Sequence, residues 1–125
     1  MEKLAILACP ESPAIFFDHE NGKFEIIGNS MPENASGFYK PVIDWLLEYA
    51  ESPLNENEFV FNLELLNTSS TKMFMDIFKV INMIDDKADV KITWYYNYGD
   101  DDMQEIGVDF KSYVNAPFEL VPVKD

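Results

Sequence analysis

The chain alternates between short runs in which every second residue is apolar and longer runs in which apolar residues recur every three or four positions. Two β-prone runs, Ala14–Asp18 and Phe24–Gly28, flank the tetrapeptide His19-Glu20-Asn21-Gly22. The Asn-Gly pair within it predicts a hairpin with a type I′ turn, because both central residues of that turn need positive φ. Further strands are predicted at Glu58–Leu66, Val90–Asn97 and Phe118–Val123.

Three segments have helical spacing of their apolar residues. Their expected extents are Asn34 or Ser36 to just before Pro53, about Thr68 to Ile84, and a stripe of Met103, Ile106, Phe110 and Tyr113 that follows Asp100-Asp101-Asp102. The second of these helices is expected to bury Phe74, Ile77, Ile81 and Ile84.

The element order ββαβαβαβ predicts a single α/β domain over residues 1–125. Helices between successive strands favour parallel pairing, whereas the opening hairpin adds an antiparallel pair. We therefore expect a mixed, mostly parallel five-stranded sheet. Two strands alternate between apolar and polar residues, so the three helices should lie mainly on one face.

The charge restricts the possible partners. Of 125 residues, 9 are basic and 23 are acidic, which gives a net charge of −14. A phosphate backbone or an anionic membrane would repel this chain, so nucleic acid and membrane partners are not expected and a protein partner is favoured.

Cysteine and histidine are too few for a disulfide or a structural zinc site, because each occurs once, as Cys9 and His19. We expect no cofactor and no metal. Cys9 ends an apolar run that is too short for a membrane span and poor as a secretory signal, which predicts a cytoplasmic location. His19 is expected to be an exposed turn residue.

Four consecutive hydroxyl residues follow the third predicted strand, in the segment Leu-Asn-Thr-Ser-Ser-Thr-Lys at 66–72. The second helix should begin here, which places residues 67–71 around a helix N-terminus, where free N–H groups favour anions. A phosphoryl group on one of these hydroxyls would be well accommodated. Ser and Thr are also preferred N-cap residues, so plain capping and ordinary loop composition remain open.

Catalytic constellations are weak in this sequence. No nucleophile with a base and no Gly-rich phosphate loop is evident. The run Asp100-Asp101-Asp102 leaves one alternative open, a small metal-binding protein or enzyme. It lacks the spacing of a calcium loop, so capping of the third helix is favoured.

Several segments in this order resemble the SiaC-type family of bacterial regulatory phosphoproteins. They are Ser-Met-Pro-Glu-Asn-Ala at 30–35, Val-Ile-Asp-Trp-Leu at 42–46, Leu-Asn-Thr-Ser-Ser-Thr-Lys at 66–72, Met-Asp-Ile-Phe at 75–78 and Ile-Thr-Trp-Tyr-Tyr at 92–96. The resemblance spans roughly residues 13–118. It implies a STAS-like fold, related in logic to anti-sigma-factor antagonists.

The resemblance also implies a function without catalysis. A cognate kinase would phosphorylate Thr68, a PP2C-type phosphatase would remove the phosphate, and the unmodified form would bind and stimulate a diguanylate cyclase. Asn67, Ser69, Ser70 and Thr71 would surround the phosphosite and contact the partner. Whether Ser69, Ser70 or Thr71 can replace Thr68 as acceptor stays open.

Overall fold

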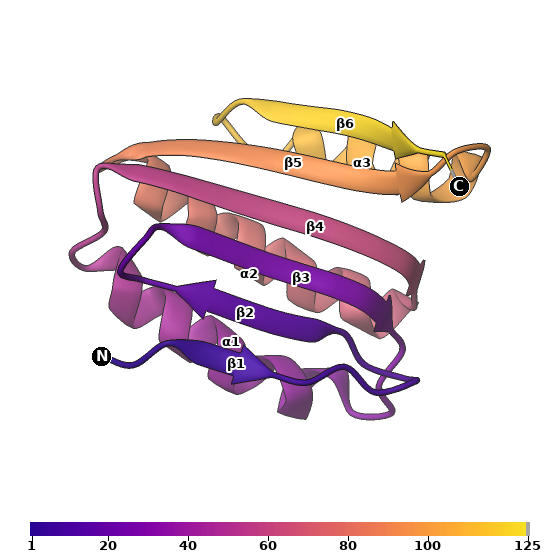
Figure 1. The fold of residues 1–125 in the computed structure, drawn as a ribbon, viewed down its shortest axis with the longest axis horizontal. Helices are drawn as coiled ribbons and strands as arrows, with labels where there is room; N and C mark the ends of the chain where they lie inside the picture. The colour runs from indigo at the N-terminus through magenta and orange to yellow at the C-terminus, as the bar shows by residue number, and fades with distance from the viewer. Residues whose placement is uncertain (125) are drawn as a thin grey trace.

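The computed structural model describes residues 1–124 and shows two layers, a six-stranded sheet and three helices (Figure 1). The strands are β1 (Leu4–Ile6), β2 (Ala14–Asp18), β3 (Lys23–Ser30), β4 (Glu56–Leu66), β5 (Asp89–Asn97) and β6 (Phe118–Val123). The helices are α1 (Ala35–Ala50), α2 (Thr68–Asp85) and α3 (Asp101–Lys111). No helix among residues 1–124 is long and apolar enough to cross a membrane.

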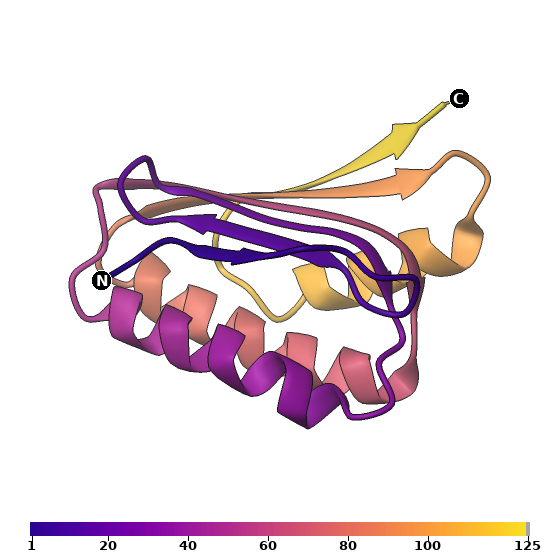
Figure 2. The same ribbon diagram turned by 60° about the horizontal axis from the view of Figure 1, so that its bottom comes forward.

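The strands lie side by side in chain order, from β1 at one edge to β6 at the other. The pairs β1–β2 and β2–β3 are antiparallel, and the pairs β3–β4, β4–β5 and β5–β6 are parallel. All three helices lie on the same side of the sheet, and Figure 2 shows the opposite side without a helix over it. The α/β class, the mixed sheet and the one-sided helices are therefore confirmed.

The core fills the space between the sheet and the helices. Trp94 on β5 is fully buried there, beside Phe61 of β4 and Phe110 of α3, with ring centroids 5.7 and 5.5 Å from its own. Its indole N–H donates to the carbonyl of Met103 at 3.2 Å. Gly107 lets α3 approach this ring closely, because a Cβ at that position would lie 2.5 Å from Trp94 Cδ1.

The prediction of five strands is wrong, because β1 forms a sixth. Its residue Leu4 pairs with Phe17 of β2, and Ile6 pairs with Ile15. Three residues are too few to establish an alternating pattern, and this strand exists because β2 offers it a free edge. Farther along the same segment, Cys9 is a free and exposed thiol.

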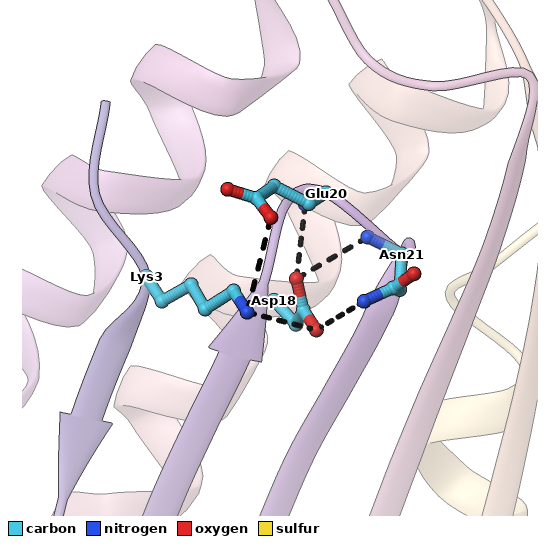
Figure 3. A network of polar contacts seen from close by, with 4 residues as sticks. All are labelled: Lys3, Asp18, Glu20 and Asn21. Atoms are coloured by element: carbon cyan, nitrogen blue, oxygen red, sulfur yellow. Dashed lines mark hydrogen bonds and ion pairs between the residues drawn. The ribbon is translucent and has the colours of Figure 1, made fainter.

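The predicted hairpin is present, but its turn differs from the prediction. Among residues 1–124 only glycines have positive φ, and in this turn that is Gly22 alone, at 67°, so the turn is not type I′. Figure 3 shows what organises it: the Asp18 carboxylate accepts from the backbone N–H groups of Glu20 and Asn21 and from the Asn21 side chain. Lys3 Nζ lies 3.7 Å from the same carboxylate. The Asn21 side chain, the two N–H groups and Lys3 lower the pKa of Asp18, and burial opposes them.

Candidate functional site

The hydroxyl segment lies where β4 passes directly into α2, at the edge of the sheet formed by the carboxyl ends of the parallel strands. In Figure 2, α1 and α2 both begin at this end of the molecule. The Asn67 N–H donates to the carbonyl of Ser30, the last residue of β3, at 3.0 Å. This hydrogen bond holds the start of α2 against the neighbouring strand.

Asn67 is the N-cap of α2. Its backbone is extended, and its side-chain oxygen accepts from the Ser70 N–H at 2.9 Å. The Ser69 hydroxyl donates to the same oxygen at 3.3 Å. Capping by one of the four hydroxyl residues, the simple alternative from the sequence, is therefore wrong, because an amide side chain performs that role.

Thr68 is the first residue of α2, and its side chain is exposed. Its hydroxyl makes no hydrogen bond to any of residues 1–124. The first turn of α2 contains no acidic side chain, so nothing there offsets the positive end of the helix dipole. A hydroxyl at this position is accessible to another protein and lies where an added negative charge is favoured.

Ser70 is fully buried, unlike its two predecessors. The Ser30 hydroxyl donates to Ser70 Oγ at 2.8 Å and is also hydrogen-bonded to the Tyr39 hydroxyl. Ser30 has one proton and gives it to Ser70, so Tyr39 must be the donor to Ser30. Burial raises the pKa of Tyr39, which keeps this phenol protonated. Ser70 thus belongs to the interior and does not form part of a contact surface.

Thr71 is half-buried and donates its hydroxyl to the Asn67 carbonyl at 3.1 Å. Of the four consecutive hydroxyls, this leaves those of Thr68 and Ser69 on exposed side chains. The structure therefore narrows the possible acceptors that the sequence left open.

The surroundings of Thr68 include residues that sequence reasoning missed. A groove of about 280 Å³ separates the first turns of α1 and α2, and Lys72 and Glu33 lie among its lining residues. Two apolar side chains at the same edge are exposed: Met31, directly after β3, by 40%, and Leu65, near the end of β4, by 47%. The only sequence signal for them was their position beside the Pro-Glu-Asn and Asn-Thr-Ser-Ser motifs.

The acidic run at the start of α3 caps this helix, which is the role that the sequence favoured. Asp100 is the N-cap and accepts from the Met103 N–H at 3.1 Å, while Asp101 and Asp102 occupy the first turn. Within residues 1–124, no group of three or more Asp, Glu, His or Cys side chains is arranged to hold a metal ion. The three aspartates at 100–102 therefore cap α3.

Two further features bear on catalysis. His19 is half-buried against Trp45, with ring centroids 6.2 Å apart, so the prediction of an exposed turn residue is wrong. A hollow of about 410 Å³ lies at the opposite edge of the sheet, and its lining residues include Lys23, Glu58 and Lys91. None of its described lining residues is Ser, Thr, Cys or His. This hollow therefore offers no hydroxyl, thiol or imidazole group.

Comparison with known proteins gives a consistent result. The family model described as "SiaC family regulatory phosphoprotein" matches residues 6–123. An uncharacterized protein of Pseudomonas aeruginosa (strain UCBPP-PA14) is 29% identical over 121 residues, which is 96% of each chain. Two solved structures are similar along nearly their whole length. Apo-SiaC from Pseudomonas aeruginosa has a TM-score of 0.87 at 29% identity and covers 97% of this chain and 99% of its own.

The other structure is a complex from the same organism, diguanylate cyclase SiaD with its activator SiaC. The matching chain has a TM-score of 0.89 at 28% identity and covers 96% of this chain and 99% of its own.

Proposed function

The chain belongs to the SiaC family of regulatory phosphoproteins, and from this premise we propose that it binds a protein partner in a manner switched by reversible phosphorylation of Thr68. In this proposal the unmodified form binds and activates a diguanylate cyclase, a cognate kinase adds the phosphate, and a PP2C-type phosphatase removes it. The protein itself acts without catalysis. The cytoplasm suits it, because the phosphate donor ATP and the cyclase substrate GTP are both present there.

The observation that carries the proposal is the position of Thr68. Its exposed side chain opens α2, while Asn67 caps the helix and Ser70 is sealed in the interior. A phosphate at this point adds a charge of about −1.5 to −2 and three strong acceptors beside the free N–H groups of the first turn. The helix dipole favours that charge by roughly 0.3–1 kcal/mol. Phosphorylation is therefore compatible with the folded helix.

In this proposal, phosphorylation weakens partner binding and leaves the fold of the protein unchanged. Met31 follows Ser30, whose carbonyl accepts from the Asn67 N–H, so its exposed apolar side chain lies close to Thr68 and a partner that covers both residues also covers the hydroxyl. A dianion in a covered, largely apolar contact loses its hydration without a matching countercharge, which is costly. Docking is thereby lost while the fold stays unchanged.

The proposal of a diguanylate cyclase as the partner rests on similarity to a solved structure. A protein of the same fold, 28% identical, is described in its solved complex as the activator of the diguanylate cyclase SiaD. The acidic charge of −14 agrees with a protein partner that offers basic or mixed surface. The relation to STAS-like anti-sigma-factor antagonists, whose switching logic is similar, belongs to the same proposal.

The first experiment tests the modification. The protein is incubated with its cognate kinase and ATP, and the product is mapped by mass spectrometry. We expect one phosphate on Thr68, its absence in Thr68→Ala, and unchanged modification in Ser70→Ala. A product without phosphate on Thr68 contradicts the proposal.

The second experiment tests the switch. Titration calorimetry with the cyclase and production of cyclic di-GMP are measured for Thr68→Ala, Thr68→Glu and the control Ser112→Glu, which adds the same charge at the exposed far end of α3. We expect Thr68→Ala and Ser112→Glu to bind and activate, and Thr68→Glu to bind poorly. Equal binding by both Thr68 variants would remove the switch even if phosphorylation occurs.

A further inference from the structure

No helix covers one face of the sheet (Figure 2), and the strands place large apolar side chains on that face. Phe16 of β2, Ile27 of β3 and Leu65 of β4 are exposed by 42%, 38% and 47%. Tyr95 and Val121 extend the patch onto β5 and β6, because Ile27 is in register with Asn62, Asn62 with Tyr95, and Tyr95 with Val121. We call the whole surface of the sheet opposite the helices the open face; these apolar residues form a patch on it.

Beside the patch, one row of the open face has alternating charge. Asp18 pairs in register with Lys23, Lys23 with Glu58, and Glu58 with Lys91. Lys3 completes the row at the edge, 3.7 Å from Asp18. From Lys3, which precedes β1, across the four strands β2 to β5, the order is thus positive, negative, positive, negative, positive.

We propose that the open face is the interface of a homodimer, in which a second copy of this chain packs face to face about a twofold axis that runs along the strands between β3 and β4. This axis sets each strand opposite a different strand of the second copy: β3 opposite β4, and β2 opposite β5. Opposite signs then meet at the centre of the charged row, because the exposed Lys23 faces the exposed Glu58 of the second copy.

The next row also avoids like charges. It contains Ala5, Phe16, Glu25, Val60, Thr93 and Glu119, in order from β1 to β6. Under the same axis Glu25 lies opposite Val60, Phe16 opposite Thr93, and Glu119 opposite Ala5. Aligned sheets pack with their strand directions within about 30° of each other, which keeps each strand over its opposite strand across this axis.

The size of the face predicts a weak dimer. Strands about 4.8 Å apart and residues about 3.3 Å apart give the central part of six strands an area of about 500 Å² per copy. The total of about 1,000 Å² is at the lower limit of specific interfaces. Two chains that each carry a charge of −14 repel each other, so self-association is favoured through a face of mixed charge over the strongly acidic rest of the surface.

Sedimentation velocity of the full chain, from about 10 µM to about 1 mM, tests the proposal in the range expected for a small interface. The wild-type mass should rise with concentration from 14.4 kDa toward twice that value. Ile27→Glu should stay monomeric. Leu47→Glu, a control on α1 with a matched exposure of 40%, should associate like the wild type. A wild type that remains monomeric at the highest concentration overturns the proposal and leaves the face to a different protein.

A charge-exchange experiment separates association from folding. Lys23→Glu and Glu58→Lys each place like charges opposite each other at both central positions, and each should weaken self-association at least about tenfold. An equimolar mixture of the two variants should form a heterodimer as readily as the wild type, because every central pair is then of opposite charge. Restored association cannot come from repaired folding, since each chain folds separately. A mixture that associates no better than either variant alone overturns the proposed axis. The inference is independent of Thr68 phosphorylation.

Discussion

Ser70→Ala tests whether the buried hydroxyl cluster holds the start of α2 in place. Ser30 and Ser70 are both fully buried, and the hydrogen bond between their hydroxyls, 2.8 Å long, joins the end of β3 to the first turn of α2. Without the Ser70 hydroxyl, the Ser30 O–H stays buried without its acceptor. That penalty is about 1–3 kcal/mol. Alanine returns about 0.5 kcal/mol as a better helix former, which leaves an expected loss of about 1.5 kcal/mol in unfolding free energy.

The matched control is Ser69→Ala, the same substitution one residue earlier. Ser69 is exposed, so the change should stay within about 0.5 kcal/mol of wild type. Urea unfolding monitored by the fluorescence of Trp45 and Trp94 measures both variants. Equal stability of Ser69→Ala and Ser70→Ala would refute the reasoning. A double-mutant cycle with Ser30→Ala adds a second criterion, because a coupling energy near zero would show that the two hydroxyls do not interact.

Three further predictions concern individual contacts elsewhere in the fold. Gly107→Ala should destabilise the protein by about 1–3 kcal/mol in thermal unfolding, because the added methyl overlaps Trp94; an unchanged Tm would contradict this packing. Asn67→Ala should cost about 1 kcal/mol and speed amide exchange in the first turn of α2; unchanged exchange would argue against the cap. Asn21→Ala should raise the pKa of Asp18 toward its ordinary value of 3.8, measured by NMR titration. In the wild type, the ionised Asp18 carboxylate stabilises the folded state at pH values above its unfolded-state pKa, and this stabilisation is lost as the pH falls through the lower folded-state pKa. The variant has less of this stabilisation, so it should lose less stability on acidification than wild type.

The sequence was most informative where one element determines its own pattern. The four residues expected to be buried on α2 are buried, and the helix begins at Thr68 as predicted. The reason is that a helix of five turns repeats its apolar spacing often enough to distinguish it from a strand or a loop. The third helix shows the limit, since it ends at Lys111 and leaves Tyr113 exposed, although Tyr113 fits the stripe.

Long-range pairing was not predictable from local pattern. The link between Ser30 and Ser70 joins residues 40 positions apart, and a serine that ends a strand has no local feature to announce it. Tyr39 on α1 is fully buried, and its hydroxyl joins this cluster through Ser30. For the same reason, only the structure showed that Ser70 is unavailable while Thr68 is exposed.

The two proposed surfaces have a geometric relation that affects the switch. A twofold axis along the strands leaves strand direction unchanged, so the carboxyl ends of β3 and β4 in both copies point the same way. Both Thr68 sites of a dimer therefore lie at one end, and a partner that is itself twofold symmetric can engage both. Linking two contacts raises the apparent affinity well above that of a single contact. Ile27→Glu should then weaken binding to a dimeric partner while binding to a monomeric partner fragment stays as in wild type, and titration calorimetry against both forms measures the difference. Equal losses for the two forms would instead place Ile27 in the partner contact itself.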